Sequence, residues 1–308
     1  MGARRSAFRL VSAPLYVRAR APLRLSFCGG GTDVSPYPEE RGGMVLSATI
    51  NQYAYASLRP RRDSKLTLAS LDYDMVARYD HPGRVRFDGK LDLIKAVVKA
   101  MKVKRGADLW VHSDAPPGSG LGSSSTLVVA MIGVLREWLG RSMESYEVAE
   151  LAYRIEREDM KLAGGRQDQY AASFGGFNFI EFGSDQTVVT PLRIRRDVLQ
   201  EMEYRLLLCY MGQTRQSAKI IDRQTASYRS GKRSVVQALD RLKKETLEMT
   251  RKGDEIIYDI TVEDPDSFVE PWVMPTRILR PFGGDPVIAE RADCQIYEAE
   301  AITNQLRH

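Results

Sequence analysis

The chain has 308 residues, of which 43% are hydrophobic and 28% charged, a composition that excludes disordered and fibrous proteins. Its length exceeds that of most single domains, so we expect two domains. The excess of 45 basic over 40 acidic residues gives a net charge of +5, which suits anionic small molecules as well as nucleic acid.

Neither a membrane span nor a secreted fold is expected. No apolar run approaches the ~20 residues that a span needs, and residues 1–25 lack the apolar core of a secretory signal. The three cysteines are odd in number and far apart, which argues against a disulfide framework and for a reducing compartment. The three histidines are too scattered to indicate a zinc site. A cytoplasmic protein is therefore expected.

The first part of the chain is rich in predicted strands. Alternating apolar and polar residues indicate them, and glycines or prolines bound them. One helix interrupts the series at residues 91–101, where apolar side chains recur at helical spacing. The strands are predicted at residues 16–28 (broken at Pro22), 44–60, 66–70, 84–89 and 107–115.

The second part of the chain is mainly helical in prediction. A helix begins near Ser124, and a second covers residues 147–162 with one apolar face. Residues 164–182 combine a glycine-flanked turn, a short helix and a strand. After a polar linker at 183–198, a second domain is expected, so the boundaries are 1–198 and 199–308. Its predicted elements are a strand at 204–212 and helices at 214–227 and 233–252.

The segment PPGSGLGSSST at 116–126 lies directly before the first of these helices. Glycines let backbone N–H groups approach a ligand, and a helix N-terminus adds unpaired donors and positive dipole, so the segment suits phosphate. No lysine follows the glycines, so the segment differs from the GxxxxGK[ST] loop. A serine-capped helix after a flexible turn is the alternative.

Two carboxylates lie in glycine-rich turns. In APLRLSFCGGGTD at 21–33, backbone groups and Asp33 can meet a polar ligand, although a tight turn with an Asx cap is the alternative. In GGRQDQY at 164–170, Asp168 follows Arg166 by two positions. A carboxylate beside an arginine stays ionised and can orient or deprotonate a hydroxyl, unless the two form a surface ion pair only.

Glu156 flanks the apolar stripe of the helix that precedes this turn. From that flank its carboxylate can reach a magnesium ion, which prefers oxygen ligands. The alternative is an ordinary glutamate on a helix surface.

Taken together and in this order, the three glycine-containing segments resemble the galactokinase, homoserine kinase, mevalonate kinase and phosphomevalonate kinase (GHMP) superfamily. Within it, GGGTD, LSATIN, GGRQDQYAASFGGFNFIEF and CYMGQTRQSAKII are similar to bacterial D-glycero-D-manno-heptose 7-phosphate 1-kinases and their L-fucokinase-like relatives. The resemblance covers about residues 16–254. It implies a two-domain α+β fold, with a ribosomal-protein-like N-terminal domain and a ferredoxin-like C-terminal domain.

The resemblance also implies roles for residues on the sugar side of the site. Asp168 would be the base or orienter of the attacking hydroxyl, and Arg24 would stabilise charge near it. Asp33 would hold sugar hydroxyls, in the GGGTD turn that contributes Gly31 and Thr32. A phosphate on the sugar would meet Arg166 or Arg215, and neither is preferred.

On the nucleotide side, the resemblance implies that ATP and Mg²⁺ are the cofactors. Ser124, with Ser123 and Ser125 as close alternatives, would join Glu156 in holding magnesium. The ATP loop would comprise Pro117, Gly118, Gly120, Leu121, Gly122, Ser123, Ser124 and Ser125.

The C-terminal end departs from the superfamily pattern. A third glycine-rich motif, similar to GAGGGG, is expected near the C-terminus, and PFGGDP at 281–286 does not match it. Residues 254–308 are not family-like. Loss of this motif and of the strand after it would leave apolar surface of the second domain uncovered, which would lower solubility and activity together.

The sequence therefore predicts a kinase that uses MgATP to phosphorylate the anomeric hydroxyl of a sugar, foremost heptose 7-phosphate, for nucleotide-activated heptose and surface glycans. Alternatives are an L-fucokinase-like enzyme for a free sugar and a catalytically silent sugar or nucleotide sensor. A nucleic-acid module rests only on the sequence pI near 9.0. The expected partner is a small sugar or sugar phosphate, without nucleic acid or membrane. A monomer and a homodimer both remain open.

Overall fold

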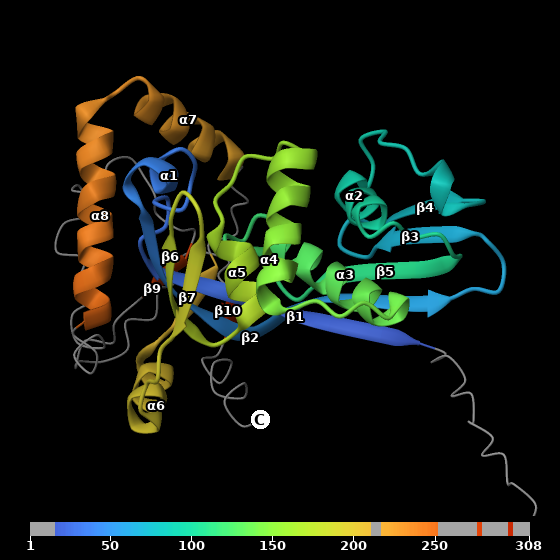
Figure 1. Ribbon diagram of the computed structural model, residues 1–308. Coiled ribbons are helices and arrows are strands. Elements are labelled where there is room, and N and C mark those ends of the chain that lie inside the picture. Colours follow the sequence, from blue (N-terminus) through green and yellow to red (C-terminus); the bar gives the residue numbers. More distant parts are fainter. Residues whose placement is uncertain (1–15, 211–216, 252–275, 279–294, 298–308) are drawn as a thin grey trace, which may run out of the picture.

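The main element of the fold is a seven-stranded mixed sheet (Figure 1). The computed structural model describes residues 16–210, 217–251, 276–278 and 295–297. The strands follow the order β4-β3-β5-β2-β6-β7, and β1 pairs with β2. Only β3 and β5 run parallel; the other pairs are antiparallel. The strands are β1 Val17–Cys28, β2 Gly43–Pro60, β3 Leu66–Ser70, β4 Met75–Tyr79, β5 Ala107–Ser113, β6 Phe177–Phe182 and β7 Thr187–Pro191.

Strand β2 is the central strand of this sheet and pairs with β1, β5 and β6. Its residues 54–60 pair with β5 and its residues 43–48 with β6, while β1 runs along its other edge. Pro22 does not end β1, because the register of β1 against β2 shifts between Pro22 and Arg24, where an irregularity accommodates a residue without a backbone donor. The predicted break at Pro22 is thus a shift of register within one continuous strand.

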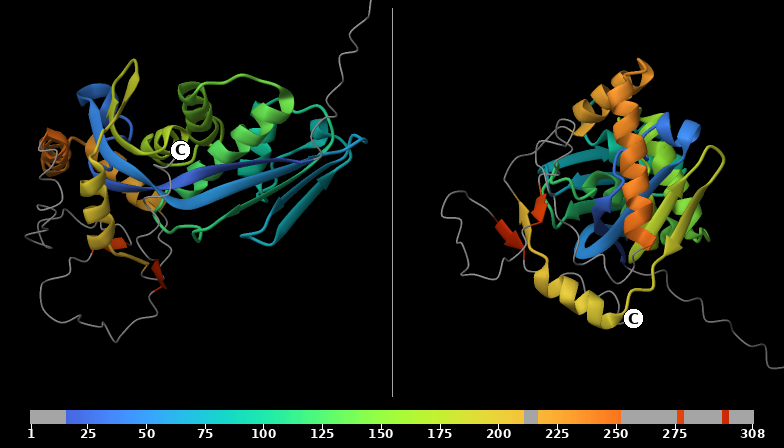
Figure 2. Two further views of the ribbon diagram at one scale, coloured as in Figure 1. Left: turned by 90° about the horizontal axis from the view of Figure 1, so that it is seen from below. Right: turned by 90° about the vertical axis from the view of Figure 1, so that its left-hand side faces the viewer.

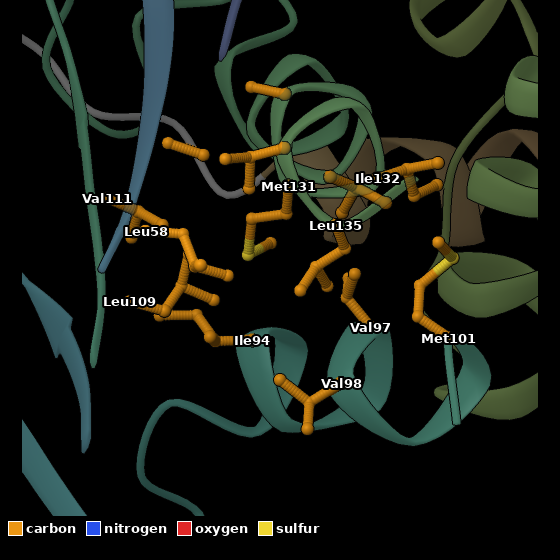
Figure 3. Packing of buried hydrophobic residues seen from close by; sticks show 14 of the residues in the cluster. Leu58, Ile94, Val97, Val98, Met101, Leu109, Val111, Met131, Ile132 and Leu135 are labelled. Carbon is orange, nitrogen blue, oxygen red and sulfur yellow. The ribbon is translucent and has the colours of Figure 1, made fainter. Parts of the chain in front are cut away.

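Helices cover one face of the sheet (Figure 2). The largest core lies between the strands and helices α2 and α3, where Leu58, Leu109 and Val111 meet apolar side chains of both helices (Figure 3). The helices are α1 Tyr37–Arg41, α2 Asp92–Ala100, α3 Ser123–Leu139, α4 Ser145–Tyr153, α5 Gln167–Phe174, α6 Arg196–Arg205, α7 Ser217–Arg229 and α8 Arg233–Arg251, with a 3₁₀ turn at Pro82–Arg84 and a π-helix at Arg154–Asp159.

Helices α7 and α8 pack beside α1 (Figure 1). Tyr37 and Tyr228 meet edge to face at 5.7 Å, and the Tyr37 hydroxyl donates to Asp240 at 2.8 Å. A second, three-stranded sheet has the strand order β10-β8-β9. Its central strand, β8 Leu208–Tyr210, pairs antiparallel with β9 Thr276–Ile278 and with β10 Gln295–Tyr297. No helix in the described part of the chain is long and apolar enough to cross a membrane.

Several predicted elements were wrong. Residues 84–89 form no strand, because Pro82 and Gly83 start a 3₁₀ turn; β4 is the hairpin partner of β3 instead. The predicted linker at 183–198 contains β7 and the start of α6, and the predicted strand at 204–212 begins within α6. The boundary between residues 198 and 199 falls inside α6, and the division there stays a prediction. The motif PFGGDP lies outside the described residues.

Replacing Leu109 with Ala tests the core between β5 and α3. Leu109 is 1% exposed, so we expect the variant to lose about 2–5 kcal/mol of unfolding free energy through lost burial and a residual cavity. Leu71→Ala is the control, because Leu71 is 61% exposed and should change stability by less than about 0.5 kcal/mol. Urea unfolding of both variants measures the difference, and equal losses would contradict this packing.

Candidate active site

A glycine loop connects β5 to the N-terminus of α3. The φ angles of Gly118, Gly120 and Gly122 are 78°, 81° and 76°. These values lie in the left-handed region, which residues other than glycine rarely adopt. A Cβ at Gly122 would also lie 3.2 Å from Cγ of Asp168. The glycines therefore let the loop turn sharply and pass directly over Asp168. The helix begins at Ser123, one residue before the predicted start.

Arg24, on β1, contacts both this loop and Asp168. Its Nε donates to Oδ1 of Asp168 at 2.7 Å, and its Nη2 lies 2.5 Å from the same oxygen. Its Nη1 donates to the carbonyl of Gly120 at 2.7 Å. Because Arg24 is only 7% exposed, water screens this pair weakly. The two predicted catalytic residues thus form one ion pair beneath the predicted ATP loop.

Asp33 joins the GGGTD turn to the segment before α5. Its carboxylate accepts from the backbone N–H of Gly31 at 2.9 Å, from that of Gln167 at 3.0 Å and from Nε2 of Gln167 at 3.2 Å. The side chain is buried. Burial raises the pKa of Asp33, the Gln167 N–H bond opposes that rise, and the nearby Asp168 charge adds to it. A Cβ at Gly165 would lie 1.9 Å from Oδ2 of Asp33, so any other residue there would displace the Asp33 carboxylate.

Gly31 and Thr32 are held from inside the protein. Thr32 is fully buried, and its Oγ1 lies 2.8 Å from the Gly29 carbonyl and accepts from the Met44 N–H at 3.0 Å. The Gly31 carbonyl accepts from Nε2 of Gln224, on α7, at 2.9 Å. The Thr32 hydroxyl is therefore engaged with backbone, whereas the turn as a whole lies beside Asp168.

Arg166 makes its contacts with residues other than Arg24 and Asp168. It forms an ion pair with Glu39 on α1, donates to the carbonyl of Gly183 at 3.3 Å and lies 5.2 Å from the centre of the Tyr153 ring. Glu39 thus neutralises the charge of Arg166. Thr214 and Arg215 lie outside the described residues.

Glu156 lies in the π-helix that follows α4, a distortion common at functional sites. The wider turn brings its side chain inside, where it is 1% exposed and not on the helix surface. Its Oε1 accepts from Oγ of Ser124 at 3.2 Å, and its Oε2 from Nε2 of Gln169 at 2.6 Å. Burial raises the pKa of Glu156, and the charge of Arg157 opposes the rise.

The oxygens of Ser124 and Glu156 fit a magnesium ion. Adjacent ligands of an octahedron with Mg–O bonds of ~2.1 Å lie about 3 Å apart, close to the 3.2 Å between these two oxygens. Ser124 is also exposed at the helix terminus, whereas Ser125 is buried. No cluster of three or more His, Cys, Asp or Glu occurs among the described residues, so phosphate and water would complete the shell, as magnesium commonly requires.

Residues 92–176 match the family model described as the GHMP kinases N terminal domain. The chain is 39% identical over 239 residues to D-glycero-alpha-D-manno-heptose 7-phosphate kinase from Campylobacter jejuni, covering 76% of this chain and 70% of that protein. The chain belongs to the GHMP kinase family. The predicted α+β fold and the prediction of a kinase are confirmed by this membership.

Two further comparisons place the chain within the GHMP kinases. The crystal structure of a D-glycero-D-manno-heptose 1-phosphate kinase from Bacteroides thetaiotaomicron is 35% identical, with a TM-score of 0.68 over 77% of this chain and 74% of that one. A bifunctional fucokinase/GDP-fucose pyrophosphorylase from Arabidopsis thaliana is 24% identical over 85% of this chain but only 26% of that protein. Both relatives predicted from the sequence are thus found.

Three residues around the site were missed from the sequence. Gln167 and Gln169 flank Asp168 and bond to Asp33 and Glu156, while Nε of Arg157 donates to the carbonyl of Gly165 at 3.2 Å. The sequence did contain a signal for Gln169: it is a polar residue followed by the small and apolar residues of a short helix, whose apolar face must be buried. Nothing in the pattern distinguishes Arg157 from a surface arginine.

Gly165→Ala tests the contact between Asp33 and the turn before α5. The added Cβ must displace the Asp33 carboxylate, and we expect turnover to fall on the order of 100-fold because Asp168 follows closely on the same turn. Gly133→Ala in α3 is the control, since its Cβ would approach no atom closer than 3.4 Å and Ala favours the helix. Measured rates equal to wild type in Gly165→Ala would contradict this constraint.

Proposed function

We propose that the chain transfers the γ-phosphoryl group of ATP to the anomeric hydroxyl of a sugar, with D-glycero-D-manno-heptose 7-phosphate as the first candidate. The observation that carries this proposal is the partly buried Arg24–Asp168 pair, which lies against Gly120 and Gly122 of the glycine loop. A carboxylate that can take a proton thus lies beside a loop suited to phosphate. The 1,7-bisphosphate product would serve the synthesis of nucleotide-activated heptose and surface glycans.

The loop at 117–125 would bind the triphosphate of ATP. Its glycines leave the backbone N–H groups accessible, and the N-terminus of α3 supplies positive dipole to the phosphate oxygens. Ser124 and Glu156 would hold magnesium, which supplies charge neutralisation on the phosphates when it is bound. Little covalent chemistry is then required from the protein, since positioning and charge carry most of the rate.

Asp168 would receive the proton of the attacking hydroxyl. Arg24 engages Oδ1, and Oδ2 accepts no hydrogen bond from the described residues, which suits it to the sugar. As the sugar oxygen bonds to the γ-phosphorus, the bond to the β–γ bridging oxygen breaks and ADP leaves. The positive charge of Arg24 would stabilise the negative charge that develops nearby during transfer.

Asp33 would place the sugar beside Asp168. Hydrogen bonds from Gly31 and Gln167 hold the carboxylate in place, and a sugar hydroxyl would bind to the acceptor capacity that these bonds leave. Gly31 and Thr32 would keep the turn in shape, Gly31 through its backbone bonds to Asp33 and Gln224 and Thr32 through its buried hydroxyl.

A kinase for an unphosphorylated sugar, similar to the fucokinases, is the second candidate. The observation in its favour is the ion pair between Arg166 and Glu39, which leaves Arg166 less able to bind a substrate phosphate. In the first candidate, the substrate phosphate would compete with Glu39 for that guanidinium. Dependence of the rate on the terminal phosphate of the sugar separates the two.

ADP release by the purified full-length chain, with MgATP and a panel of free and phosphorylated sugars, tests the proposed function. We expect turnover with heptose 7-phosphate and a new anomeric phosphate signal in the phosphorus NMR spectrum. Asp168→Asn should lower the rate by ~10²–10⁴-fold, because the general base is lost, while ADP binding persists. Silence of folded wild-type protein across the panel, or full activity of Asp168→Asn, would contradict the assignment.

A further inference from the structure

Gln169 is a fully buried amide on the first turn of α5, next in sequence to Asp168. Its Nε2 donates to Oε2 of Glu156 at 2.6 Å and to Oγ of Ser125 at 3.1 Å. One side chain therefore links three elements: α5, the π-helix after α4, and the first turn of α3.

Burial of the Gln169 amide is unfavourable for the stability of the fold. A buried amide loses its hydration, and only its donor side is compensated, because Oε1 is buried with no partner among the described residues. The next residues of α5, Tyr170 to Ala172, are buried as well, so an apolar side chain would suit the surroundings of position 169. A stability role does not account for the bonds that Gln169 makes.

The bonds from Gln169 and from Ser124 fix the orientation of the Glu156 carboxylate. Because Gln169 occupies Oε2, the other oxygen, Oε1, is directed to Ser124 at the N-terminus of α3. Successive residues of an α-helix point about 100° apart, so Asp168 can face Arg24 while Gln169 faces Glu156. The first turn of α5 thereby sets the distance between the Asp168 carboxylate and the oxygens of Glu156 and Ser124.

We propose that Gln169 is a positioning residue for phosphoryl transfer, which holds Glu156 against the first turn of α3 and keeps the metal-binding oxygens in register with Asp168. This inference rests on the proposed function for its chemical meaning.

Gln169→Leu removes the amide at nearly constant volume, and Gln224→Leu is its matched control. Gln224 is also a buried glutamine with an unpartnered Oε1, but its Nε2 bonds to Gly31 on the sugar side. Gln169→Glu is the second variant, since it keeps the shape and places a carboxylate against Glu156. Thermal unfolding first establishes that each variant is folded.

Binding of Mn²⁺ to the protein with ADP, measured from the electron paramagnetic resonance signal of free Mn²⁺, gives a readout independent of turnover. We expect Gln169→Leu and Gln169→Glu to bind Mn²⁺ at least ~10-fold more weakly, because one or more hydrogen bonds to the charged ligand are lost. In turnover, the Mg²⁺ concentration for half-maximal rate should rise and kcat fall, while KM for the sugar stays near wild type. Gln224→Leu should instead raise the sugar KM and bind Mn²⁺ normally.

Two results would overturn the inference: folded Gln169 variants that bind Mn²⁺ as wild type does, or weakened Mn²⁺ binding of equal size in Gln224→Leu. Wild-type protein that binds no Mn²⁺ with ADP would overturn it as well. Failure of the proposed function has a different signature, since wild type would then bind Mn²⁺ and ADP but release no product with any sugar. The Mn²⁺ titration would still decide the role of Gln169.

Discussion

The partly buried ion pair between Arg24 and Asp168 is the interaction on which the rest of the site depends. Arg24 reaches Asp168 from β1, and the same guanidinium holds the Gly120 carbonyl of the loop before α3. Burial raises the pKa of Asp33, the nearby charge of Asp168 adds to that rise, and Arg24 supplies the positive charge that pairs with Asp168. Strand, glycine loop and helix α5 therefore keep their relative places through one side chain.

The local parts of this site could be predicted from the sequence, because their signals are local. Three glycines before an apolar helix predicted the loop at 116–122, and the glycines near Asp33 and Asp168 predicted the turns that contain these two residues. Elements without strong periodicity were missed or misplaced, such as β7 and α6 in the segment taken for a linker. The inward turn of Glu156 was also beyond the sequence, since a π-helix has no simple residue pattern.

Contacts across the chain could be predicted only through the family resemblance. Arg24 and Asp168 are 144 positions apart, and no spacing rule connects them. The same holds for α7 and α8, which reach back to the GGGTD turn and α1 through Gln224, Tyr228 and Asp240. These contacts hold the GGGTD turn on the side of α7, while Asp33 holds it on the side of α5. The turn is thus fixed between two parts of the chain.

A double-mutant cycle on Arg24 and Asp168 tests most directly whether the pair acts as a unit. The rate of ADP formation with the preferred sugar is measured for wild type, Arg24→Gln, Asp168→Asn and the double variant, after each is shown to fold. If the pair is one functional group, the double variant is no slower than the slower single variant, because either change already removes the unit. If the two losses multiply, the residues act independently and the central role of the pair is contradicted.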